Sequence, residues 1–272
     1  MISPEIFTAV INSYLPEPQA SLLNGILFGV DVKASGEFYY QLKRVGLLHI
    51  VVLSGINITL LGVMVSHATS KFSKKISACV TIITIVLFIL FVGPDPPIVR
   101  AGIMGVLSLV AILFERKKFA LYSLFISVVC ILFFKAEWLK TISFQLSFGA
   151  TLGIILFGPK VSIAKGTIPS RFKSEITKDL RTTFSAQLFT VPIIFFYFKQ
   201  ISTIAPLSNI LVSFFIPPLM IFGFATALFG KIHYILGLLP AYICYGILTY
   251  MVFIIKGLSK VPYGFFVWAP QH

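Results

Sequence analysis

The sequence predicts an all-α polytopic membrane protein with about eight transmembrane or re-entrant helices, preceded by short amphipathic helices. Its composition is the first reason. Of the 272 residues, 57% are hydrophobic and only 11% are charged, and phenylalanine occurs 28 times. A soluble domain carries about 25% charged residues. The second reason is that apolar runs of near-membrane length recur along the chain, separated by short polar segments.

Residues 1–46 are predicted to form a lead-in of short amphipathic helices. The stretches PEIFTAVINSYL, PEPQASLLNGILFGV and GEFYYQLKRVG are too short or too charged to cross about 30 Å of hydrocarbon. We therefore expect them at the membrane interface. The chain begins without the basic and long apolar regions of a signal peptide, so we expect the first membrane segment to direct insertion.

Residues 47–260 are predicted to form the transmembrane domain, with 261–272 as a C-terminal tail. The predicted spans are 47–66, 76–93, 98–114, 119–134, 143–158, 184–198, 204–230 and 234–256. Several fall short of the roughly 20 residues of a full crossing, which predicts tilted, broken or re-entrant helices.

Charge predicts the orientation. If the N-terminus is outside, the basic clusters at 71–75, 116–118 and 160–181 all lie inside, as the positive-inside rule requires. This asymmetry accounts for much of the net charge of +13. The polar segment 160–181 therefore favours a lipid surface, or topology alone, over a nucleic-acid patch.

The run HIVVLSGINITLLG places polar groups within an apolar stretch, where each costs roughly 1–3 kcal/mol unless it is paired. In a helix, His49, Ser54 and Asn57 fall within an arc of about 140°. The opposite, small face comprises Gly55, Thr59 and Gly62. Two interpretations stay open: an interhelical hydrogen-bonded histidine, or the polar lining of a translocation path.

Arg100 follows the sequence PDPP and lies just inside an apolar segment. The prolines predict a helix break before it. Its side chain either snorkels to the outer surface or faces an aqueous cavity, where intramembrane charges are usually functional.

Four further polar residues fall at membrane depth. They are Gln145, Ser147, Gln187 and Asn209. Each alone is more often a helix-packing contact than a site, but their number favours a polar interior.

Catalysis is not expected. None of the nine acidic residues lies deep within a predicted span, and the histidines and cysteines lack zinc-ligand spacing. We expect neither a metal nor a cofactor. Ser54 and His49 also suggest an intramembrane serine protease, but VVLSG lacks the glycine two places before the serine that nucleophile turns commonly have. No Walker-A pattern occurs.

Several stretches resemble the ComEC competence proteins. VGLLHIVVLSGINITLLG is similar to the family's G-x-x-H-x-x-x-x-S-G signature, and LPEPQASLLNGILFG to its lead-in. PPIVRAGIMG, FQLSFGATLGIILFGP, SAQLFTVPIIFFYFKQIS and PLSNILVSFFIPPLM follow in the family's order, so the resemblance covers about residues 16–230. The motif residues carry onto His49, Ser54, Gly55, Arg100, Gln145, Ser147, Gln187 and Asn209. The family usually has histidine in place of Asn57, and its acidic residue after the lead-in glycine is shifted here to Asp31.

The resemblance implies a multi-pass bacterial inner-membrane protein that passes single-stranded DNA into the cytoplasm during natural transformation. Larger family members add an outer soluble domain and a metallo-β-lactamase-like domain, and we expect this chain to be the competence membrane domain alone. The expected partners are single-stranded DNA, membrane lipid, a cytoplasmic helicase-type ATPase, and a separate nuclease or DNA-receptor protein; a homo-oligomer is a further option. Two other functions stay open: a small-solute or lipid-linked transporter, and a non-transporting assembly subunit.

Overall fold

The structure is a computed structural model that describes residues 4–30, 36–48, 55–114, 120–159, 168–198, 200–262 and 264–267. The elements in chain order are α1 (Glu5–Tyr14), α2 (Gln19–Phe28), α3 (Gly36–Arg44), α5 (Gly55–Ala68), α6 (Lys74–Val92), α7 (Pro96–Leu113), α8 (Ala120–Lys135), the 3₁₀ helix η1 (Ala136–Lys140), α9 (Ile142–Phe157), α10 (Ile168–Phe198), β1 (Gln200–Ser202), α11 (Ala205–Ser213), α12 (Ile216–Ile232), α13 (Tyr234–Ser259) and β2 (Phe265–Val267).

The predicted helical membrane fold is confirmed. Within the described residues, four helical segments are long and apolar enough to cross a membrane: α6, α7, α8 with η1, and α13. Large apolar side chains such as Phe133, Phe134 and Phe253 are exposed on the surface of the protein, where soluble proteins rarely have many of them together. The count of eight spans is approximate, since α5 and α9 are shorter apolar helices.

The helix break predicted at PDPP is present, and a second break divides one of the predicted spans. α6 ends before Gly93, which has a φ of 109°, and α7 begins with Pro96, where the missing amide donor costs nothing. The predicted span 204–230 is divided into α11 and α12, which meet at an angle of 50°. This pair is therefore a broken span or a re-entrant loop.

Two details differ from the prediction. α10 begins at Ile168, so the second half of the polar segment 160–181 belongs to a long helix. Part of the C-terminal tail forms β2, which pairs antiparallel with β1. The tail is therefore attached beside the start of α11.

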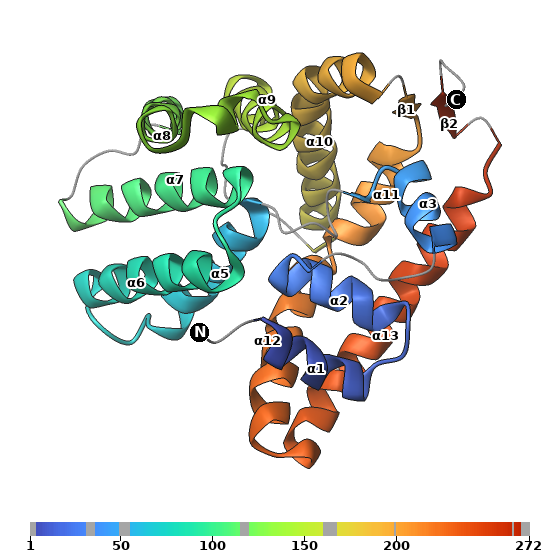
Figure 1. The fold of residues 1–272 in the computed structure, drawn as a ribbon, viewed down its shortest axis with the longest axis horizontal. Coiled ribbons are helices and arrows are strands. Elements are labelled where there is room, and N and C mark those ends of the chain that lie inside the picture. The colour runs from blue at the N-terminus through green and yellow to red at the C-terminus, as the bar shows by residue number, and fades with distance from the viewer. Residues whose placement is uncertain are drawn as a thin grey trace.

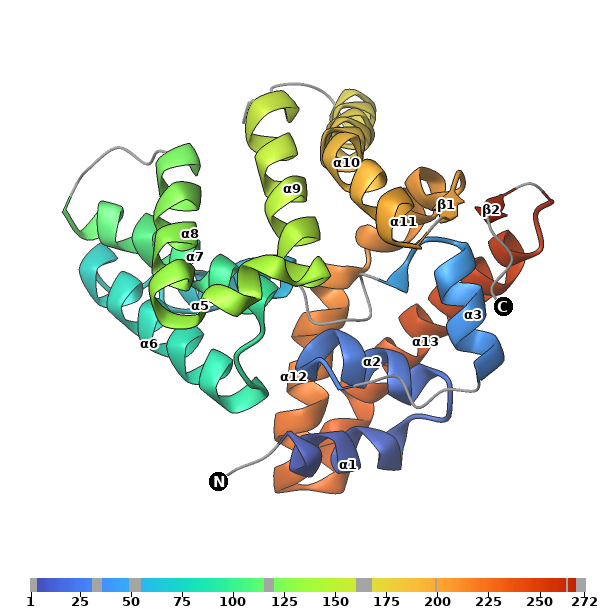
Figure 2. The same cartoon turned by 45° about the horizontal axis from the view of Figure 1, so that its top comes forward.

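The helices form two modules (Figures 1 and 2). The first module contains α1–α3 and α11–α13, from the two ends of the chain, and the second contains α5–α10, from its middle. In Figure 1 the first module occupies the lower right, and α5–α8 lie on the left.

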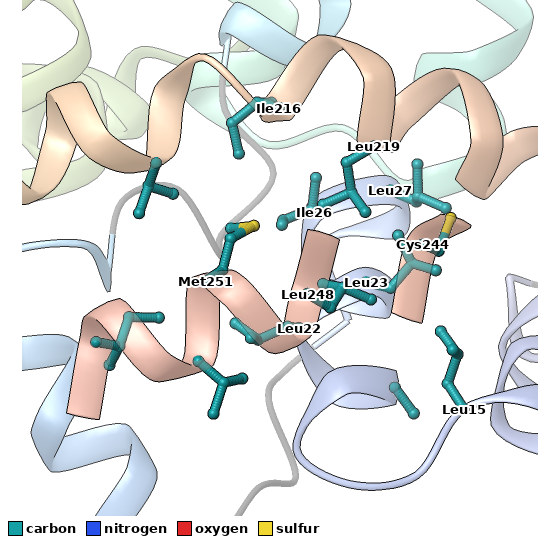
Figure 3. Packing of buried hydrophobic residues seen from close by; sticks show 14 of the residues in the cluster. Leu15, Leu22, Leu23, Ile26, Leu27, Ile216, Leu219, Cys244, Leu248 and Met251 are labelled. Carbon is teal, nitrogen blue, oxygen red and sulfur yellow. The ribbon is translucent and has the colours of Figure 1, made fainter. Parts of the chain in front are cut away.

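The main core lies in the first module. Figure 3 shows Leu22, Leu23 and Ile26 of α2 facing Leu219 of α12 and Leu248 of α13. In a membrane protein, close packing rather than escape from water holds such side chains together. A smaller cluster joins α5, α6 and α7 in the second module; it contains Ile58, Ile85, Ile98 and Ala101.

The expectation that α2 is an amphipathic interfacial helix is wrong, because every one of its residues is buried. Two of its polar side chains donate hydrogen bonds inside the module. Gln19 Nε2 donates to Thr249 Oγ1 at 3.3 Å, and Asn24 Nδ2 donates to Asn12 Oδ1 at 2.7 Å. Since α2 carries no charge, α1, α12 and α13 enclose it without burying an ion.

Tyr14 attaches α1 to the connection between α12 and α13. Its hydroxyl donates to the Tyr234 carbonyl at 2.7 Å, and the two rings stack with centroids 4.8 Å apart. A Cβ at Gly230 or Gly237 would lie 2.7 or 2.6 Å from Tyr14 atoms, so the ring requires both glycines. Burial, and secondarily the neighbouring Tyr234, raise the pKa of the Tyr14 hydroxyl.

A buried arginine at the junction of three helices

The guanidinium of Arg100 lies between α7 and α9. Its side chain is 5% exposed. Nε and Nη2 donate to Ser147 Oγ at 3.1 and 2.8 Å, and Nη1 donates to Thr151 Oγ1 at 2.5 Å. Nη1 also lies 3.5 Å from Met104 Sδ. Arg100 therefore binds the neighbouring helix instead of snorkelling to a surface.

Helix α9 presents hydroxyls to Arg100 because Ser147 and Thr151 are four residues apart and share one face. Thr151 is held in turn by its own hydrogen bond to the Ser147 carbonyl at 2.9 Å. The opposite face contains Gly149 and Gly153, and a Cβ at Gly153 would lie 2.1 Å from the Ser185 carbonyl oxygen of α10. This G-x-x-x-G spacing allows close helix packing, so α10 supports the helix that carries the hydroxyls.

Gly55 completes the junction from α5. A Cβ at this position would lie 3.2 Å from Arg100 Nη2 and 3.0 Å from Ala101 Cβ. A larger residue would displace the guanidinium or separate α5 from α7. The structure thus brings together three predicted site residues, Gly55, Arg100 and Ser147.

Thr151 is a member of this site that the sequence did not reveal. The signal that would have identified it is its position one turn after Ser147, on the same helix face. A threonine in an apolar helix is ordinary, however, because it usually bonds to its own preceding turn.

Among the residues that the structure describes, no carboxylate pairs with the positive charge of Arg100. Within the part of the chain that the structure describes, each acceptor of an Arg100 hydrogen bond is a neutral hydroxyl or thioether. Neutral dipoles stabilise a buried cation less than a carboxylate does. The junction is therefore suited to attract an anion rather than to perform acid–base chemistry.

Metal binding has no visible basis in the described ranges. No group of three or more His, Cys, Asp or Glu side chains lies close enough there to hold an ion.

Asn57 lies away from this junction. Its side chain is 2% exposed, and Nδ2 donates to the Ile26 carbonyl of α2 at 2.8 Å. Ile26 is in the last turn of α2, where carbonyls have no partner within the helix. Asn57 therefore joins the two modules by satisfying a helix end.

We expect Asn57→Ala to lower the free energy of unfolding by about 1–3 kcal/mol, the cost of leaving a buried carbonyl unpaired. The measurement is thermal unfolding of the detergent-purified protein. Thr59→Ala is the control, because Thr59 is exposed on the same helix and its hydroxyl donates to the Gly55 carbonyl one turn before it. Equal unfolding temperatures for both variants would contradict this assignment.

The remaining predicted site residues are dispersed. Gln145 Nε2 donates to the Lys140 carbonyl at 3.4 Å, and Asn209 Nδ2 donates to Thr183 Oγ1 at 3.4 Å, which joins α11 to α10. Gln187 is half-buried on α10. His49 and Ser54 lie outside the described residues. A path lined by all of these residues stays a prediction.

The sequence of this chain is similar to those of other known proteins. Residues 26–272 match the family model described as "Competence protein". The chain is 22% identical over 207 residues to "ComE operon protein 3" of Bacillus subtilis (strain 168), an alignment that covers 75% of this chain and 26% of that protein. It is 29% identical over 185 residues to an uncharacterized protein of Aquifex aeolicus (strain VF5), with 68% and 40% covered. No solved structure matches the chain. The alignments thus span less than half the length of these relatives.

Proposed function

Because this chain belongs to the Competence protein family, we propose that it forms a conduit for single-stranded DNA through the inner membrane of a bacterium during natural transformation. The observation that carries the proposal is the buried guanidinium of Arg100, which has only neutral acceptors among the described residues. DNA supplies the missing negative charge through its phosphates. In the proposed topology the N-terminus is outside and Arg100 lies toward the outer side.

One cation surrounded by hydroxyls suits passage better than a cluster of cations. A phosphate must bind favourably enough to enter and weakly enough to leave. When no phosphate is present, Ser147 and Thr151 accept the hydrogen bonds of the guanidinium. An arriving phosphate therefore replaces these hydroxyls as the acceptor, and the hydroxyls replace it when it leaves. The site therefore attracts the strand without trapping it.

Transport inward requires an energy source. Moving a phosphate against an inside-negative potential costs about 2.3 kcal/mol per unscreened charge per 100 mV. The sequence has no Walker-A pattern, so we assign the motor to a helicase-type ATPase on the cytoplasmic side. A separate nuclease or DNA receptor would supply the single strand outside.

The proposal is tested by following labelled DNA in cells that lack the gene. DNA should accumulate outside the inner membrane, and the wild-type gene should restore entry. An equally abundant His49→Ala protein should not restore it if the signature segment lines the path. Normal entry of DNA without the gene or a paralogue would overturn the proposal, and saturable flux of a compact solute would then favour a small-solute transporter.

A further inference from the structure

The two modules meet at a group of five phenylalanines, here called the aromatic seam. Its members are Phe7 of α1, Phe28 of α2, Phe88 and Phe91 of α6, and Phe224 of α12. Three ring pairs cross between the modules: Phe7–Phe91, Phe28–Phe91 and Phe88–Phe224. Their centroids are 5.8, 6.2 and 5.9 Å apart, and their planes are inclined by 76°, 77° and 77°.

All three crossing contacts are therefore edge-to-face. Such contacts are favourable, but each ring presents only an edge or one face to its partner. A ring face that receives another ring's edge is also the surface on which a nucleobase stacks, and this stacking tolerates any base. When a strand passes, a base can therefore stack on a ring of the seam in place of the ring-to-ring contact that is lost.

A short series of residues connects the seam with the arginine junction of the second module. Asn57 bonds to Ile26 of α2, two residues before Phe28. Gly55 lies two residues before Asn57 on α5, and a Cβ added to this glycine would lie 3.2 Å from Arg100 Nη2. The boundary that is aromatic along α6 therefore becomes polar at Asn57, and the cationic junction lies just inside the second module, two residues before Asn57 along α5.

From this arrangement we propose that single-stranded DNA passes between the two modules, with phosphates at Arg100 and bases against the rings of the seam. This inference rests on the proposed function and adds the route. The strand requires the modules to separate at the seam, because the rings now touch one another. The contact between α10 and α11, which includes the Asn209–Thr183 hydrogen bond, stays closed and acts as the hinge.

The experiment locks the seam reversibly. Cys79, Cys130 and Cys244 are first replaced by alanine, and a cysteine pair is introduced as Phe88→Cys with Phe224→Cys. A short bis-thiosulfonate reagent joins the pair, and a reductant releases it. The matched control is Phe157→Cys with Phe189→Cys, which joins α9 to α10 within one module across a similar centroid distance of 6.3 Å.

Relative to the same double-cysteine variant before linkage, we expect the linked seam to reduce entry of labelled DNA at least tenfold, with return to the unlinked level after reduction. The linked control pair should leave the entry of its own unlinked variant unchanged. Undiminished entry through a seam whose linkage is verified by mass spectrometry overturns the route. The proposed function fails separately, if cells without the gene import DNA normally.

A second measurement on the wild-type protein covers the case in which the cysteine variants do not fold. A strand containing 5-iododeoxyuridine is stalled during import and irradiated. Adducts should map to peptides containing Phe28, Phe91 or Phe224, and less to the Phe144–Phe148 stack on α9, whose centroids are 6.0 Å apart. Adducts confined to other helices overturn the route.

Discussion

Arg100→Ala should reduce transformation by about a hundredfold while the amount of protein in the membrane changes little. The contact that this variant removes is the proposed one between Arg100 and a phosphate of the strand. Removing one partner of a buried charged contact costs about 2–5 kcal/mol, and each 1.4 kcal/mol corresponds to a factor of ten. Ser147 and Thr151 lose a donor in this variant, but hydroxyls find local carbonyl acceptors, as Thr151 already does. The helices should therefore still assemble.

The matched control for this prediction is Arg181→Ala. Arg181 is exposed on α10, and its Nε donates to the Phe157 carbonyl at the end of α9 at 3.2 Å. Both variants lose one positive charge, but only Arg100 lies at the junction. Arg100→Lys keeps the charge and loses the paired contact of Nε and Nη2 with Ser147, so its activity should be intermediate.

Transformation frequency and immunoblots of membrane fractions provide the two readouts. If transformation and protein amount fall by the same factor in Arg100→Ala, Arg100 joins α7 to α9 and has no role toward phosphate. Equal losses in the Arg100 and Arg181 variants would show that total charge matters rather than position.

The sequence predicted best what depends on local chemistry. The break at PDPP follows from the missing amide of proline, and it is present between α6 and α7, which begins at Pro96, two residues before the predicted span 98–114. The interruption within 204–230 was expected only in general form, from span lengths, and its place between α11 and α12 emerged from the structure. Arg100 was conspicuous because a charge in an apolar run is costly wherever it lies.

The sequence could not show which distant residues each side chain contacts. Asn57 belongs to the same polar arc as His49 and Ser54 on a helical projection, yet its partner is a carbonyl of α2 in the other module. The burial of α2 likewise depends on α12 and α13, which are distant in sequence. Thr151 gained importance only once Arg100 was seen to reach it.

Gly153→Ala should be the most destabilising of the conservative glycine substitutions in the second module. The added Cβ would lie 2.1 Å from the Ser185 carbonyl oxygen, far inside van der Waals contact. Backbone atoms on a helix move only with the helix, so α9 and α10 must separate. Overpacking of this kind costs about 1–3 kcal/mol and occasionally more.

Gly105→Ala on α7 is the matched control, because its nearest neighbour is Ile85 Cδ1 at an ordinary 3.7 Å. In a helix interior alanine is favoured over glycine by about 1 kcal/mol, so this variant should unfold at the wild-type temperature or above. Unfolding followed by tryptophan fluorescence in detergent separates the two outcomes. If Gly153→Ala unfolds no earlier than Gly105→Ala, the close approach of α9 to α10 is dispensable. If it unfolds earlier, displacement of α9 also moves Ser147 and Thr151 on its opposite face, and transformation should fall with stability because Arg100 loses its hydroxyl partners.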